Sequence, residues 1–74
     1  MRLAVEAFAE EMENKLLRND HKGGWATCDL TYLERKLLEE IIEYLKDGRE
    51  GELVDISNFC MMLWNRKEET GLYA

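Results

Sequence analysis

The sequence has no proline and little of the chemistry that disulfide or zinc scaffolds need. Its 74 residues include two cysteines, Cys28 and Cys60, which can form one disulfide at most. Neither cysteine belongs to a Cys-x-x-Cys or Cys/His group with the spacing of metal ligands. A disulfide scaffold is therefore not expected, and the lack of proline leaves long helices uninterrupted.

Long apolar runs and strand signals of alternating polarity are also missing. No stretch approaches the ~20 apolar residues that span a bilayer, and the N-terminus lacks the order of features that marks a secretion signal. Sixteen acidic against ten basic residues give a formal net charge of −6, which argues against binding to nucleic-acid phosphates and favours cation binding. We expect a cytoplasmic protein with no membrane and no nucleic acid among its partners.

A chain of this length is expected to form one domain, residues 1–74, that is marginally stable as a lone monomer. A domain near this size buries only about 60% of the surface that its unfolded chain exposes. Without a disulfide scaffold, the remaining stability has to come from a bound metal ion or from self-association.

Helical signals divide the chain into three segments. The first is rich in Ala, Glu, Leu and Met, with an apolar residue at every fourth position from Ala4 to Leu16. The second places leucine and isoleucine on one broad arc. The predicted fold class is all-α, a three-helix chain with a central antiparallel helical hairpin. The expected helices span residues 2–18, 31–47 and 50–69.

Two signals mark the ends of the second helix. Thr31, followed three residues later by Glu34, forms a capping box, so the helix is expected to start with Thr31 as its cap. Gly48 follows the last helical residue and suits the left-handed conformation of a C-cap. The Gly48 turn then leads directly into the third helix.

The third helix is apolar on nearly every side between Leu53 and Trp64, where only Asp55, Ser57 and Asn58 interrupt the pattern. Two partner helices in so short a chain cannot cover that whole surface. We therefore expect the bundle to be completed by homo-oligomerisation, as a dimer or a tetramer.

Four acidic residues stand at matching places on either side of the Gly48 turn. In an antiparallel hairpin, Glu40 faces Asp55 and Glu43 faces Glu52, because the members of each pair are equidistant from the turn. The two acids on each helix share one face, roughly 4.5 Å apart along the axis. Packed helices lie ~8–10 Å apart, so all four carboxylates can reach one space. Carboxylate oxygens suit Mg²⁺, or Mn²⁺, better than zinc.

The alternative interpretation is a solvated acidic face formed by Glu39, Glu40, Glu43 and Glu52. Acids at such spacings are common on exposed helices, and spacing alone favours the two interpretations about equally. Asp55 shifts the balance towards a metal site because Val54 and Ile56 flank it in the most apolar part of the chain. An unpaired carboxylate there is costly, and a bound cation removes the cost.

The same residues resemble a family signature. Residues 39–43, EEIIE, and 52–55, ELVD, are similar to the E-E-x-x-E…E-x-x-D pattern of MazG-like all-α nucleoside triphosphate pyrophosphohydrolases. Residues 55–62 resemble that family's third helix, and residues 21–25 resemble the connection ahead of its metal helix. The resemblance implies Mg²⁺-dependent cleavage of a nucleoside triphosphate into a monophosphate and pyrophosphate.

The resemblance also implies roles for individual residues. Bound Mg²⁺ would neutralise the phosphates and lower the pKa of a coordinated water, with one carboxylate as the base. Trp25 can stack on a base, or equally can anchor the connection onto the core. The implied metal ligands and catalytic residues are Glu40, Glu43, Glu52 and Asp55. The resemblance also places Asn58 near the substrate. The other candidate substrate-binding residues are chosen by position, because they lie near the connection or the acidic stripe; they are Lys15, Lys22, Trp25 and Lys36.

Two other functions fit the same pattern. A helical oligomerisation or protein-interaction module would use the apolar third helix to bind itself or a partner, with the acids only keeping the chain in solution. A metal-binding but inactive relative of the hydrolase family would hold the ion without releasing pyrophosphate. Metal titration separates the module, which does not respond, from the other two.

Overall fold

A computed structural model describes residues 2–18 and 24–70, and within those ranges it contains three α-helices and no strand. The helices are α1 (Arg2–Arg18), α2 (Leu30–Asp47) and α3 (Glu50–Thr70). The prediction of an all-α chain of three helices is confirmed. None of these helices combines the length and the apolar character that a membrane span requires.

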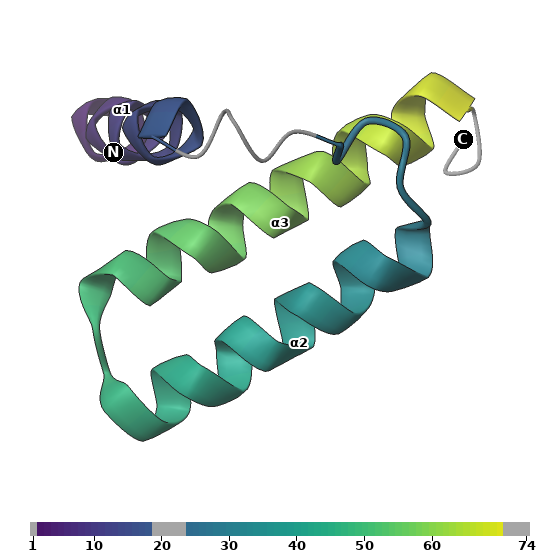
Figure 1. Cartoon of the computed structure of the whole chain (residues 1–74). Helices are drawn as coiled ribbons and strands as arrows, with labels where there is room; N and C mark the ends of the chain where they lie inside the picture. The colour runs from purple at the N-terminus through teal and green to yellow at the C-terminus, as the bar shows by residue number, and fades with distance from the viewer. Residues whose placement is uncertain (1, 19–23, 71–74) are drawn as a thin grey trace.

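The helix α3 is the element on which the other two are arranged. Helices α2 and α3 lie side by side and are joined at one end by residues 48–49, whereas α1 runs at a steep angle to them (Figure 1). In the described part of the chain, α3 packs against both α1 and α2, and those two do not pack against each other. The side of α3 between α1 and α2 is therefore not closed by a direct helix contact.

The turn between α2 and α3 depends on a glycine. Gly48 has φ 68° and ψ 23°, and its N–H donates to the carbonyl of Tyr44 at 2.7 Å. This left-handed conformation is strained for residues that carry a Cβ atom. The predicted C-cap at Gly48 is confirmed.

The start of α2 differs from the prediction. The helix begins at Leu30 and its N-cap is Asp29, whose side chain makes no capping hydrogen bond. The Asp29 carbonyl already accepts from the N–H of Leu33 at 3.4 Å, so the first turn closes ahead of Thr31. The prediction of Thr31 as the cap is wrong for that reason.

The buried apolar core of the described residues is small. Leu33 is 1% exposed and Met62 is 8% exposed, and α1 has no buried residue. The apolar arc predicted on α2 is largely uncovered, since Leu45 at its far end is 76% exposed. On α3, Trp64 is 54% exposed. The large hydrophobic side chains exposed on α2 and α3 are Tyr32, Leu38, Ile41, Ile42, Leu45, Leu53 and Trp64.

Candidate functional site

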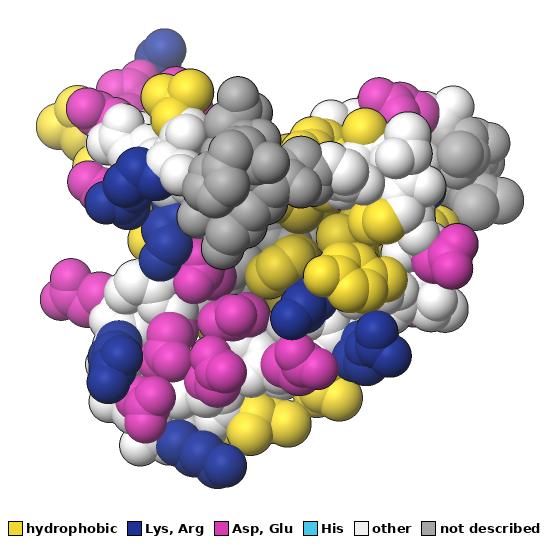
Figure 2. Space-filling view, in the orientation of Figure 1, with side chains coloured by type: hydrophobic (Ala, Val, Ile, Leu, Met, Phe, Trp, Pro, Cys, Tyr) yellow, Lys and Arg dark blue, Asp and Glu magenta, His cyan; other side chains and the backbone are white. Residues whose placement is uncertain are grey.

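A cavity of about 740 Å³ lies between the three helices and the connection that precedes α2. In Figure 2, Asp and Glu side chains gather along α2, with hydrophobic side chains above them towards α3. Six of the nine site residues predicted from the sequence line this cavity. They are Lys15, Trp25, Lys36, Glu40, Asp55 and Asn58.

Helical spacing brings these residues to one space. On α2, Lys36 and Glu40 are one turn apart, and on α3 Asp55 and Asn58 are also about one turn apart. Because α2 and α3 lie side by side, these two faces line opposite walls of the cavity. Lys15 enters from the last turn of α1.

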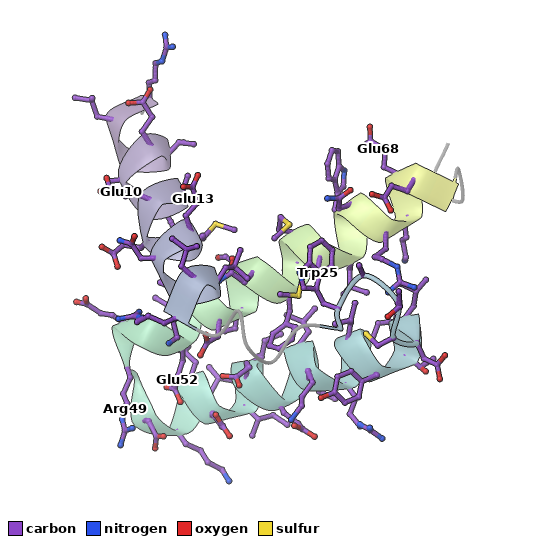
Figure 3. The ribbon with its side chains drawn as sticks, turned by 45° about the horizontal axis from the view of Figure 1, so that its top comes forward. Glu10, Glu13, Trp25, Arg49, Glu52 and Glu68 are labelled. Carbon is purple, nitrogen blue, oxygen red and sulfur yellow. The ribbon has the colours of Figure 1, made fainter. Side chains whose placement is uncertain are left out.

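One end of the cavity is apolar and aromatic. Trp25 lies against α3 in Figure 3, and its carbonyl accepts from Arg66 Nη1 at 2.9 Å and from Cys28 Sγ at 3.7 Å. The bond from Arg66 holds the connection on α3 through the backbone of Trp25, and Trp25 also lines the cavity. The apolar and aromatic lining residues not predicted as site residues are Leu16, Ala26, Cys28, Tyr32, Leu33, Phe59 and Met62.

A spacing signal for these missed residues was present in the sequence. Leu33 precedes Lys36 by three residues, and Phe59 and Met62 continue the stripe that begins at Asp55. If the acidic and the apolar residues on one face of each helix are treated together as one wall of a site, then Leu33, Phe59 and Met62 are predicted as site residues. All residues that line this cavity, Phe59 among them, belong to one copy of the chain.

The other end of the cavity carries the acidic residues. Burial raises the pKa of Glu40, the carboxylates of Asp55, Glu43 and Glu52 raise it further, and the Lys15 ammonium lowers it. All four predicted acids are therefore close enough to interact electrostatically around Glu40.

Lys15 is the counter-charge at this end. Its Nζ atom lies 3.3 Å from Asp55 Oδ1 and donates to the carbonyl of Gly51 at 3.4 Å. The Lys15 and Asp55 side chains are about a quarter exposed, 26% and 27%. Lys15 was predicted to bind phosphate, and that role stays a prediction; the contact that the structure shows is the one with Asp55.

The remaining two acids lie outside the cavity lining. Glu52 is 9% exposed, and its Oε1 accepts from the backbone N–H of Arg49 at 3.3 Å. This bond caps the first turn of α3, and both residues lie at the turn end of the helix pair in Figure 3. Glu43 is exposed. The four acids are thus brought near one another, but Glu52 is used as a helix cap.

A hard cation fits this donor set in chemistry and in electrostatics. The donors are carboxylates without thiol or imidazole, which suits Mg²⁺ or Mn²⁺, and their mutual repulsion around Glu40 is relieved by positive charge. With the side chains as they stand, residues 2–18 and 24–70 contain no group of three or more acids, cysteines or histidines that could hold an ion. Binding therefore requires side chains such as Lys15 and Glu52 to leave their present partners.

Asn58 carries an unsatisfied polar atom in the wall of the cavity. The residue is 4% exposed, and its Nδ2 donates to the carbonyl of Met12 at 3.3 Å. Because that carbonyl can only accept, the amide nitrogen has to face it. Oδ1 is then left buried without a hydrogen-bond partner, at a typical cost of about 1–3 kcal/mol.

The two other predicted lysines have different outcomes. Lys36 Nζ lies 3.4 Å from Glu39 Oε1 and 5.9 Å from the centre of the Tyr32 ring, on the cavity wall. Lys22 lies outside the described residues. The positive charge described at the cavity therefore comes from Lys15 and Lys36.

Comparisons of the chain with protein-family models, with curated proteins and with solved structures gave no match. The resemblance to MazG-like hydrolases stays a prediction. The function has to be argued from the side chains of the cavity.

Proposed function

We propose that this chain is a Mg²⁺-dependent nucleotide pyrophosphohydrolase of the MazG-like all-α type, which cleaves a nucleoside triphosphate into a monophosphate and pyrophosphate. The observation that carries the proposal is a cavity with an apolar, aromatic end and an end that holds acids and Lys15, with Lys36 on the wall beside Tyr32. A nucleotide is divided in the same way, between a flat base and charged phosphates. The cavity volume of about 740 Å³ falls within the roughly 300–1,000 Å³ of small-molecule sites.

The residues of the cavity take separate roles in this proposal. Trp25 stacks on the base at the apolar end, and Asn58 presents its buried carbonyl oxygen to a hydrogen-bond donor of the nucleotide. Lys15 and Lys36 bind phosphate oxygens. The α-phosphate then lies next to the carboxylates, and one of these accepts a proton from the attacking water.

Glu40, Glu43, Glu52 and Asp55 would hold the metal ion. When bound, Mg²⁺ supplies charge neutralisation of the phosphates and a water of lowered pKa. The support from this chain is the donor chemistry together with the repulsion that raises the pKa of Glu40. Mn²⁺ suits the same donors and serves as the spectroscopic substitute.

The antiparallel hairpin is proposed to complete a helical bundle by homo-oligomerisation, as a dimer or a tetramer. Support comes from the apolar stripe of α2, where Leu38, Ile42 and Leu45 are exposed, and from the small core around Leu33. Monomeric proteins rarely leave a contiguous stripe of this kind in water. Light scattering after size exclusion is expected to give at least twice the chain mass. Leu45→Glu is expected to shift the distribution to the monomer.

Pyrophosphate release tests the enzymatic proposal directly. Purified protein is incubated with standard and modified nucleoside triphosphates in Mg²⁺, and pyrophosphate is measured alongside monophosphate. We expect equal amounts of the two products from at least one nucleotide, and none from the Asp55→Asn variant. Orthophosphate in place of pyrophosphate would show cleavage at a different bond and would overturn the proposed reaction.

Metal binding is tested separately from turnover. A ligand present at ten times its dissociation constant stabilises the folded state by about 1.4 kcal/mol. Millimolar Mg²⁺ is expected to raise the melting temperature of the wild type, and Asp55→Asn is expected to remove the effect. Glu68→Gln is the matched control, because it removes one negative charge from an exposed position at the far end of α3 (Figure 3).

A non-catalytic helical interaction module is the second candidate. It is favoured by the exposed hydrophobic residues of α2 and α3 and by the use of Glu52 as a helix cap. The module predicts self-association without any response to Mg²⁺. A metal-binding but inactive relative predicts the thermal response without pyrophosphate from any nucleotide.

A further inference from the structure

Lys15 places a positive charge among acids of α2 and α3. Its Nζ atom contacts Asp55 Oδ1 at 3.3 Å and the Gly51 carbonyl at 3.4 Å. The same ammonium acts on Glu40, the acid on the opposite wall. One side chain of α1 thus neutralises carboxylates that belong to both α2 and α3.

A divalent ion and the Lys15 ammonium compete for the same carboxylate. An ion that takes Asp55 as a ligand draws on the group that Lys15 now contacts, and two cations that close repel each other. Binding of the ion therefore weakens the interaction of Lys15 with these acids.

The released side chain has a second place to go within the same cavity. Lysine carries its charge on a flexible four-carbon stem, so the ammonium can move while α1 keeps its position. A separate bond between α1 and α3, from Asn58 Nδ2 to the Met12 carbonyl, does not involve Lys15. The cavity next to Lys15 is also lined by Lys36, so a moved Lys15 ammonium would have a second lysine on the same cavity wall.

We propose that Lys15 is an exchanging residue, which occupies the acidic end of the cavity in the metal-free chain and is displaced towards the substrate phosphates by the entering divalent ion. This inference rests on the proposed function and adds an order of events to it. Before the metal ion binds, Lys15 competes with it for Asp55. After displacement, Lys15 binds the substrate phosphates, so binding of the metal ion raises the affinity of the chain for phosphate.

Lys36 is the matched control for this exchange. It lines the same cavity and carries the same charge, but its Nζ contacts Glu39, which is not one of the four proposed ligands. Lys15→Met and Lys36→Met therefore change the net charge of the chain equally. Only Lys15→Met removes a competitor from Asp55.

The test is Mn²⁺ binding by calorimetry, with no nucleotide present. Lys15→Met is expected to bind Mn²⁺ about tenfold more tightly than the wild type, because a unit charge is removed from beside a divalent ion. Lys36→Met is expected to change the affinity less than about threefold, because the Coulomb interaction between two charges weakens as the distance between them grows. Wild-type binding with unchanged or weaker binding by Lys15→Met overturns the exchange and leaves the proposed metal site standing. Absence of binding in every variant overturns both.

A second measurement uses the wild-type protein, so its outcome does not depend on whether the variants fold. Lysine acetylation is followed residue by residue by mass spectrometry, with and without Mg²⁺. The reactivity of Lys15 is expected to rise severalfold on addition of the ion, and to fall again when inorganic triphosphate is added with it. Equal reactivity of Lys15 in the free and Mg²⁺-bound states overturns the exchange.

Discussion

Replacing Glu40 by glutamine is expected to stabilise the metal-free protein, although Glu40 is a proposed functional residue. Burial and three neighbouring carboxylates raise the pKa of Glu40 above its ordinary value of 4.5. A raised pKa means that the folded state holds the proton more tightly than the unfolded state does. Ionisation of Glu40 therefore costs stability, and Glu40→Gln removes that cost without a large change of shape.

The charged partners of Glu40 give the part of the effect that can be sized. Repulsion between partly exposed acids amounts to roughly 0.2–0.5 kcal/mol for each pair, and three such neighbours act on Glu40. Attraction to Lys15 offsets part of the sum. These pairs contribute about 0.5–1 kcal/mol, which is roughly 2–8 °C in melting temperature for a domain of this size, and relief of the burial that is the largest cause of the raised pKa adds to it.

Thermal unfolding at a series of pH values checks the sign as well as the size. Well below pH 4.5 Glu40 is neutral in both states, so variant and wild type are expected to be equally stable. As the pH rises through the raised pKa of the folded protein, the wild type loses stability relative to Glu40→Gln. The full difference is reached above that pKa.

Salt and metal provide the controls. The advantage of Glu40→Gln is expected to shrink in high salt because partly exposed charges are screened, and Mg²⁺ is expected to stabilise the wild type more than the variant. The exposed Glu68→Gln carries the same charge change and is expected to shift the melting temperature little. A Glu40→Gln variant that is less stable than the wild type at pH 7 without metal would refute the reasoning.

Two further predictions concern stability alone. Leu33→Ala, at a side chain only 1% exposed, is expected to cost about 2–4 kcal/mol in urea unfolding, whereas Leu3→Ala at an 80% exposed position of α1 is expected to be nearly neutral. Gly48→Ala is expected to destabilise by about 1–2 kcal/mol because of its positive φ, and Gly51→Ala, in a helix with only the end of Lys15 nearby, to stabilise by about 0.5–1 kcal/mol. Equal effects at the two glycines would contradict the role given to Gly48.

The helices were predictable because their signals are local. Residue spacing and the glycine at position 48 act within one or two turns, and the observed bounds differ from the expected ones by about a residue. The start of α2 was misjudged because Thr31 and Asp29 both have capping side chains, and sequence alone does not say which carbonyl closes the first turn. The observed helix uses the earlier one.

The placement of site residues was predictable only where it follows from helix faces. Glu40 and Asp55 are both on the cavity wall, as expected of residues equidistant from a tight turn. Glu52 is not, because as the third residue of α3 it competes for the free backbone N–H of Arg49. The contact between Lys15 and Asp55 joins residues forty positions apart, and it depends on the angle at which α1 crosses α3, which no local pattern encodes.

Two side chains that lower the stability of the ligand-free folded state, Glu40 and Asn58, line the same cavity. Glu40 is ionised against three neighbouring acids, and Asn58 Oδ1 is buried without a donor. In a domain with so small a core, such losses are a substantial part of a total stability of roughly 0.05–0.15 kcal/mol per residue. A cation relieves the first and a hydrogen-bond donor relieves the second, and both groups line the same cavity. A ligand that brings the two together, as a metal-bound nucleotide does, gains binding energy from interactions that the empty chain lacks.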